Sequence, residues 1–195
     1  MRKLVYYVAV SIDGYIAGQS GSTAGLSSDP DYVTALAELL PETIPGHLRG
    51  LLGVTEPARR FDTVLMGRNT HQLAVDAGLT SGYPHLDQHV FTTHDDLPVD
   101  PTVTLHDGDP VAVVRALKAQ PGRDLWMCGG GHLAGQLLTE IDELILKVSP
   151  VALGRGVPLF GSACAPVAFH LGTTRFFDNG VVMLSYQRRG CMVGP

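Results

Sequence analysis

Three consecutive glycines are the first feature of this chain that could do chemistry. Gly129, Gly130 and Gly131 follow the apolar run LWMC and precede the amphipathic run HLAGQLL. Residues without a Cβ let a ligand lie against bare backbone, and a glycine turn that opens a helix exposes N–H groups beside the positive end of the helix dipole. This arrangement suits a diphosphate. A simple tight turn is the alternative, since the usual dinucleotide fingerprint has another spacing and follows the first strand.

A second candidate anion site lies in VLMGRNTHQ, residues 64–72. An apolar strand runs into Gly67 and then into a capped helix. Arg68 can donate several hydrogen bonds to one phosphate, and Thr70 can cap the helix or contact a phosphate oxygen. The alternative is a surface arginine beside an ordinary cap. Thr92 and Thr93 add hydroxyls at the end of a third strand, VFTT.

Metal and nucleophilic chemistry are not favoured by the remaining polar residues. His85 and His89 have a helical ligand spacing, but they flank a proline-containing loop and a strand start, so we predict no metal site. Cys128 lies in an apolar strand and reads as a buried thiol, and the chain has no G-x-S-x-G element.

Strands that alternate with helices must position these residues. The pattern predicts one α/β domain over 1–195, with three layers: a mostly parallel central sheet, helices on both faces and a C-terminal antiparallel hairpin joined at DNG. The segment after the first strand, IDGYIAGQSGSTAGLSSD, is predicted to be a loop. The predicted strands are 3–11, 62–67, 88–93, 102–106, 124–128 and 142–150. The predicted helical segments are 27–40, which opens with capping residues, 69–78, 109–122 and 131–140, with a weaker helical stretch over 46–60.

The composition is that of a globular protein. The net charge of −5 does not favour binding to nucleic acid or to an anionic membrane, and no apolar run is long enough to cross a bilayer. We interpret the apolar N-terminus as a strand rather than a signal peptide. The three cysteines form no CxxC pair, which predicts reduced thiols and a cytoplasmic protein.

The stretches VAVSIDGYIAG, VLMGRNT, VFTT and LWMCGGGHLAGQLL occur in the order and approximate spacing of the dihydrofolate-reductase-like superfamily. The run DELILKVSPVALGRGVPLFG, residues 142–161, is particularly similar to the branch that contains the C-terminal reductase domain of the riboflavin-biosynthesis deaminase/reductase. The resemblance covers about 3–188 and leaves 19–60 unmatched.

The resemblance implies an NADPH site that crosses the sheet. Gly130 and Gly131 would meet the diphosphate, and Arg68 would hold the 2′-phosphate or the diphosphate. His132 would either help to bind phosphate or remain a solvated helix residue. The full set of implied cofactor residues is Ala9, Ile16, Ala17, Gly67, Arg68, Thr70, Thr92, Thr93, Cys128, Gly129, Gly130, Gly131, His132 and Leu133.

The catalytic group is less clearly marked. Asp13 matches a loop position of the family, but it also fits a turn aspartate that bonds its own backbone. Folate-reducing members carry a carboxylate on the helix before the MGR strand, where this chain has Leu48, Leu51 and Leu52. Glu56 is nearby but closer to the strand than the family pattern requires.

The sequence therefore predicts an NADPH-dependent reductase of a small heterocycle, pterin-like or a riboflavin-pathway pyrimidine of the 5-amino-6-(5-phosphoribosylamino)uracil type. The phosphate of such a pyrimidine would need basic residues; the candidates are Arg49, Arg59, Arg60 and Arg155. The alternative is a catalytically silent nucleotide-binding or assembly module with the same fold. A homodimer is expected, with Val151, Leu153, Val157, Leu159 and Phe160 as candidate contact residues.

Overall fold

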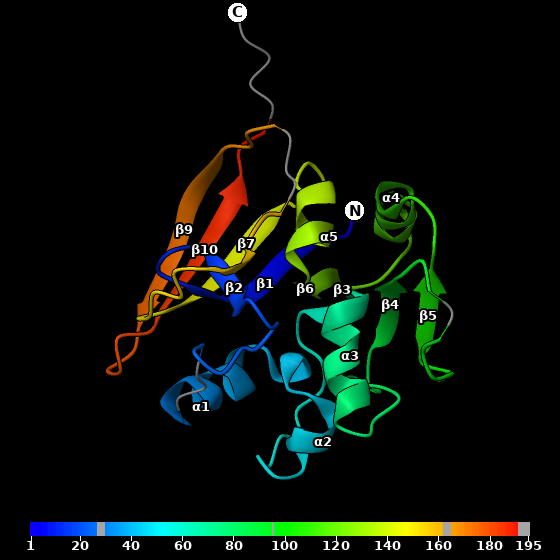
Figure 1. Ribbon diagram of the computed structural model, residues 1–195, viewed down its shortest axis with the longest axis horizontal. Coiled ribbons are helices and arrows are strands. Elements are labelled where there is room, and N and C mark those ends of the chain that lie inside the picture. Colours follow the sequence, from blue (N-terminus) through cyan, green and yellow to red (C-terminus); the bar gives the residue numbers. More distant parts are fainter. Residues whose placement is uncertain (27–29, 95, 162–164, 191–195) are drawn as a thin grey trace, which may run out of the picture.

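The computed structural model describes residues 1–26, 30–94, 96–161 and 165–190. Its main feature is an eight-stranded sheet. In spatial order the strands are β5 (Val103–His106), β4 (Asp87–Phe91), β3 (Phe61–Gly67), β6 (Asp124–Gly129), β1 (Leu4–Ser11), β7 (Glu143–Ser149), β10 (Val182–Arg188) and β9 (Phe169–Phe176). The six strands from β5 to β7 run parallel, whereas β10 and β9 are antiparallel to their neighbours (Figure 1). The predicted fold class is confirmed.

Apolar runs explain why the central strands lie where they do. β1 reads LVYYVAVS, and its side chains are buried on both faces of the sheet. The odd residues Val5 and Tyr7 join one core cluster, and the even residues Leu4 and Tyr6 join the other. This alternation between two cores is what a strand in a three-layer fold requires.

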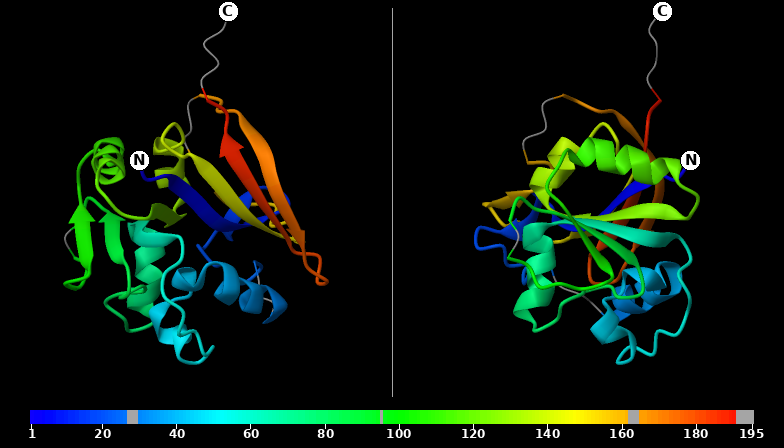
Figure 2. Two further views of the ribbon diagram at one scale, coloured as in Figure 1. Left: turned by 180° about the vertical axis from the view of Figure 1, so that it is seen from behind. Right: turned by 90° about the vertical axis from the view of Figure 1, so that its right-hand side faces the viewer.

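Helices cover both faces (Figure 2). One face carries α1 (Pro30–Leu39), the short η1 (Pro41–Thr43), α2 (Gly46–Arg49) and α3 (Arg68–Asp76). The other carries α4 (Pro110–Ala119) and α5 (Gly131–Gln136). Asp109 caps α4 by accepting a hydrogen bond from the N–H of Val111 at 2.9 Å. Most predicted helices are confirmed, but α5 ends earlier than expected and the weak stretch over 46–60 forms only the turn of α2.

The predicted loop after β1 is partly wrong. Tyr15–Gly18 form a strand, β2, which pairs with β8 (Gly156–Pro158) in a small antiparallel sheet. This pairing joins segments far apart in the chain, so no local pattern revealed it. Asp13 supports the same junction from the preceding turn, because its carboxylate accepts hydrogen bonds from the N–H groups of Leu153 at 3.0 Å and Gly154 at 2.7 Å.

A buried carboxylate fixes the start of β3. Glu42 is fully buried and accepts hydrogen bonds from the backbone N–H groups of Arg59 (3.1 Å), Arg60 (2.7 Å) and Phe61 (2.7 Å). A buried charge is tolerated when it is hydrogen-bonded in this way. Glu42 therefore ties η1 to the amino end of the sheet, opposite to the carboxyl end, where ligands bind in open α/β sheets.

Candidate functional site

Two strand-to-helix corners lie side by side at the carboxyl end of the sheet. β3 leads through Gly67 into α3, and β6 leads through Gly130 into α5. Met66 is in register with Gly129. A Cβ built on Gly130 would lie 3.6 Å from the backbone nitrogen of Gly67. The two predicted anion sites are thus adjacent.

The three glycines differ in their backbone conformation and in the space that a Cβ would have. Gly130 has a φ of 99°, a backbone conformation that residues with a side chain rarely adopt. A Cβ on Gly131 would lie 2.0 Å from the carbonyl oxygen of Pro158, so this glycine makes room for β8. A Cβ on Gly129 would lie 3.2 Å from Oγ1 of Thr70. Only Gly130 combines a special backbone conformation with a position beside Gly67.

A first cavity of about 370 Å³ opens beside these corners. Its walls are the ends of β3, β4 and β5 together with the starts of α3, α4 and α5. Eight of the residues that the resemblance implies for cofactor binding line this cavity: Gly67, Arg68, Thr70, Thr92, Thr93, Gly130, His132 and Leu133. His94 and His106, which were not among the implied residues, line it as well.

A second cavity of about 590 Å³ lies on the other side of the corners. It is lined by six of the residues that the resemblance implies for cofactor binding: Ala9, Ile16, Ala17, Cys128, Gly129 and Gly131. Asn69, Thr70, Gly130 and His132 line both cavities. The two cavities are therefore neighbouring compartments that meet at the glycine corner.

Arg68 faces the first cavity with an acidic partner. Its guanidinium forms a two-pronged ion pair with Asp96, and the Nη2–Oδ2 distance is 3.0 Å. The hydrogen bonds of this pair lower the pKa of Asp96 and raise that of Arg68. A ligand phosphate would have to share Arg68 with this carboxylate. The cost is small, because solvent screens an ion pair at the surface.

Thr92 and Thr93 follow the last residue of β4 rather than ending the strand as predicted. The Thr92 hydroxyl accepts a hydrogen bond from the N–H of His94 at 3.0 Å and so closes a turn. Thr93 is exposed at the cavity edge.

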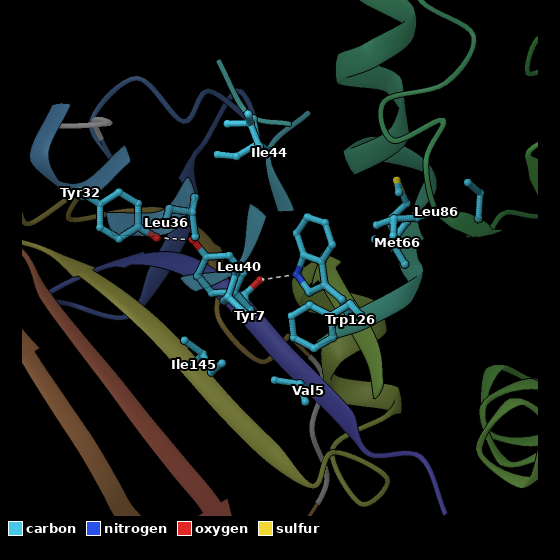
Figure 3. Packing of buried hydrophobic residues seen from close by; sticks show 14 of the residues in the cluster. Val5, Tyr7, Tyr32, Leu36, Leu40, Ile44, Met66, Leu86, Trp126 and Ile145 are labelled. Atoms are coloured by element: carbon cyan, nitrogen blue, oxygen red, sulfur yellow. Dashed lines mark hydrogen bonds between the residues drawn. The ribbon is translucent and has the colours of Figure 1, made fainter. Parts of the chain in front are cut away.

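Three aromatic side chains that line the second cavity, Tyr7, Tyr32 and Trp126, lie close together in the hydrophobic core (Figure 3). The Tyr7 and Tyr32 hydroxyls are hydrogen-bonded to each other, and Trp126 Nε1 donates to the carbonyl oxygen of Tyr7 at 3.1 Å. Burial raises the pKa of Tyr32 to about 12 and that of Tyr7 further, so both hydroxyls stay protonated at neutral pH. The sequence analysis missed all three residues as site residues.

Cys128 lines the same cavity as a protonated thiol. Burial raises its pKa to about 11, and its Sγ lies 3.7 Å from the Tyr83 hydroxyl. A thiol with this pKa is a poor nucleophile. The other two cysteines, Cys164 and Cys191, lie outside the described residues.

The two predicted catalytic carboxylates lie outside both cavities. Asp13 bonds Ser11 Oγ and the backbone of 153–154, which lowers its pKa and gives it the turn-holding role. Glu56 is exposed and pairs with Arg59 at 3.8 Å. Neither position supports a catalytic role, and no carboxylate occurs among the described residues that line the second cavity.

The four candidate arginines are also placed elsewhere. Arg49 donates to the carbonyl oxygens of Pro41 and Glu56. Arg60 forms a two-pronged pair with Glu143 at 3.0 and 2.6 Å. Arg59 and Arg155 are exposed, and neither lines the second cavity.

The histidines considered as metal ligands have other neighbours. His85 Nε2 lies 2.9 Å from the carbonyl oxygen of Glu42, and His89 Nδ1 lies 2.8 Å from Nε2 of His106. Across the described ranges, no group of three or more acidic, histidine or cysteine side chains gathers as a metal site would require.

Comparison with known proteins decides the family. The model of the RibD C-terminal domain matches residues 2–183. The chain belongs to the RibD C-terminal domain family. The matched range includes 19–60, the segment that the sequence analysis left outside the resemblance.

Relatives and solved structures agree with this assignment. Uncharacterized protein YwjB of Bacillus subtilis (strain 168) is 34% identical over 191 residues, covering 96% of this chain and 98% of that protein. A Shewanella sp. PV-4 protein assigned provisionally to riboflavin biosynthesis has a TM-score of 0.71 at 24% identity, covering 96% of this chain and 99% of that one. Dihydrofolate reductase from Enterococcus faecalis, complexed with NADP(H), has a TM-score of 0.64 at 14% identity, covering 96% and 97%. These two structures show a shared reductase-type fold.

Proposed function

We propose that this RibD-family protein is an NADPH-dependent reductase that transfers hydride to a small heterocyclic substrate. One observation carries the proposal: every residue that the resemblance implies for cofactor binding lines one of two cavities that meet at Gly130. The residues come from the strands β1, β2, β3 and β6, from the turn after β4 and from the starts of α3 and α5, so a shared cleft is not a consequence of their order in the sequence.

The glycine corner fits a dinucleotide. The backbone at Gly67 is open, since a Cβ there would meet nothing within 4 Å, and a Cβ on Gly130 would fill the gap between the corners. Gly67 and Gly130 would hold the diphosphate, and Arg68, Thr92 and Thr93 would hold the adenosine end. Bound NADPH would supply the hydride.

The second cavity would then take the nicotinamide and the substrate. Ala9, Ile16 and Ala17 would form the nicotinamide wall beside the corner, and the aromatic floor would take a flat ring. A pterin and a riboflavin-pathway pyrimidine are both flat heterocycles, and both belong to the proposed class.

A catalytically silent module with this fold is the second candidate. The specific observation in its favour is that the predicted carboxylates lie away from the second cavity. Turnover of a pterin, a quinone or a deaminated pyrimidine with NADPH would exclude it.

The proposal extends to a cytoplasmic homodimer. Val151, Leu153, Val157, Leu159 and Phe160 are all half-buried in a single chain, which leaves part of each available for a contact. Light scattering gives the stoichiometry directly. No helix within the described residues is long and apolar enough to cross a membrane.

The test of the proposed function is a fluorescence titration with NADPH and NADH, on the natural protein and on Arg68→Ala. We expect saturable NADPH binding that weakens about tenfold in the variant. The variant loses charge-assisted hydrogen bonds to phosphate, and release of Asp96 offsets part of that loss. NADH affinity should change less if Arg68 holds the 2′-phosphate.

Arg175→Ala is the matched control, because Arg175 lies on the exposed strand β9 and its guanidinium is 5.3 Å from the Phe177 ring centroid. Its loss should leave both affinities unchanged. Absence of NADPH binding at millimolar concentration would refute the proposed function.

A further inference from the structure

The floor of the second cavity is a continuous aromatic surface. The Tyr83 and Trp126 rings meet edge to face with centroids 4.9 Å apart, and Tyr7 lies 6.1 Å from Trp126. Tyr7, Tyr32 and Trp126 line this cavity and are each less than 10% exposed, so we call this part of the cavity its deep end. Such rings bind the face of a flat conjugated molecule.

A buried cation stands at the same end. Lys147 projects from β7, lines the second cavity and is 3% exposed. Its Nζ donates to the carbonyl oxygen of Leu26 at 3.0 Å and lies 4.7 Å from the centroid of the Tyr32 ring. A carbonyl oxygen and a ring face are both favourable neighbours for a lysine head group in a nearly dry pocket.

The arginines that a phosphorylated substrate would use are placed elsewhere. Arg49, Arg59, Arg60 and Arg155 do not line the second cavity. Among its described lining residues, Lys147 and two histidines, His47 and His132, are the only side chains that can carry positive charge. His132 lies at the corner shared with the first cavity, which the cofactor phosphates would occupy. Among the described lining residues, the cavity therefore has one lysine and two histidines but no guanidinium fork.

We propose that the substrate of this protein is an unphosphorylated, flat conjugated ring that lies on the Tyr7–Trp126 floor and directs an electronegative oxygen toward Lys147. The inference rests on the proposed function, because it assumes that the corner is occupied by the cofactor. A compact oxygen with full or partial negative charge matches a single ammonium, whereas a phosphate on a ribose chain calls for several convergent donors. The chain thus departs from a phosphoribosyl substrate while keeping the family fold.

The first test is a binding titration of lumazine, a flat unphosphorylated dione, on the NADP⁺-saturated protein, followed by lumazine fluorescence and by calorimetry. We expect saturable binding that weakens at least about tenfold in Lys147→Met, because a charge-assisted hydrogen bond is lost. Lys118→Met is the control: Lys118 is also buried, but it binds the carbonyl oxygen of Glu140 and the carboxylate of Asp142 and does not line the second cavity. Its variant should lose stability and keep lumazine affinity.

A second test needs no variant. The natural protein is titrated with 5-amino-6-(ribosylamino)uracil and with the same compound phosphorylated on the ribose 5′-hydroxyl, a pair that differs only in the phosphate. We expect the two dissociation constants to agree within about threefold. Tightening of about tenfold or more by the phosphate would overturn the proposal, as would unchanged lumazine affinity in a folded Lys147→Met or no lumazine binding to the natural protein.

The outcomes separate this inference from the proposed function. Lumazine is also titrated in the absence of NADP⁺. Failure of NADP⁺ to bind, with lumazine binding that still depends on Lys147, would refute the reductase and leave the substrate-end assignment standing. Normal NADP⁺ binding, together with much tighter binding of the phosphorylated uracil, would refute the substrate-end assignment and leave the reductase proposal standing.

Discussion

Gly130 is the residue at which backbone conformation and the proposed cofactor site coincide. Its φ of 99° is available to glycine and strained for other residues, and the space next to it faces Gly67. A side chain here would affect folding and binding through separate causes. This separation makes the residue informative.

We predict that Gly130→Ala lowers the free energy of unfolding by about 1–3 kcal/mol and weakens NADPH binding by at least about tenfold. The strain costs stability, and the added methyl group fills the gap between the corners. Chemical denaturation and a cofactor titration measure the two effects. Gly78→Ala is the control, because Gly78 also has positive φ, 78°, with open space around it and no cavity. The Gly78→Ala variant should lose stability but keep its NADPH affinity. Equal NADPH affinity in both variants would contradict the account.

At the residue scale, sequence reasoning named residues that line both cavities and missed the aromatic residues and the lysine of the second cavity. Gly67, Arg68 and Gly130 stand at ends of predicted strands, where local pattern and the family resemblance act together. Tyr32 comes from the segment that the resemblance left unmatched. Lys147 carried a signal that went unused, since a lysine within the apolar strand LILKVS is unusual.

At the scale of elements, the contact between β8 and the start of α5 decides how the cleft is closed. The carbonyl oxygen of Pro158 occupies the place where a Cβ on Gly131 would lie, at 2.0 Å. The N–H of Gly161 also donates to the Gly131 carbonyl oxygen at 2.7 Å. β8 can therefore approach the corner only because residue 131 is glycine.

We predict that Gly131→Ala lowers the free energy of unfolding by more than about 2 kcal/mol, and by more than Gly130→Ala does. The reason is that overpacking against backbone forces β8 to shift. Thermal and denaturant unfolding of the two variants make the comparison. The packing explanation would fail if Gly131→Ala were as stable as the natural protein.

The element scale also shows what local pattern cannot reveal. Capping at Asp109 and the DNG turn predicted α4 and the closing hairpin correctly, since both signals are local. β2 was predicted as a loop, because its only strand partner is about 140 residues away in the chain. The pairing depends on tertiary structure, so composition alone misassigned it.

At the scale of the whole molecule, histidines with lowered pKa values couple stability to pH. Desolvation lowers the pKa values of four histidines, His71, His85, His89 and His106. The pKa of His89 is lowered to about 4. A histidine with a lowered pKa binds fewer protons in the folded state than in the unfolded state. Its contribution is therefore fully present above pH 6.5 and is lost as the pH falls toward the folded value.

We predict that the free energy of unfolding decreases between pH 6.5 and about 4, and that His89 accounts for about 1–2 kcal/mol of the decrease, because solvent screens part of the effect at this partly exposed ring. Denaturant unfolding at several pH values, on the natural protein and on His89→Gln, tests this. The variant should show a shallower dependence; an unchanged slope would contradict the assignment.

The proposed function depends on the two corners acting together on one nucleotide. The most direct measurement is a crystal structure of the protein with NADP⁺. The account predicts the diphosphate against the backbone nitrogens of Gly67 and Gly130, with the adenosine end in the first cavity and the nicotinamide beside Ala9 in the second. A nucleotide bound elsewhere, or a corner closed by the protein's own side chains, would contradict it.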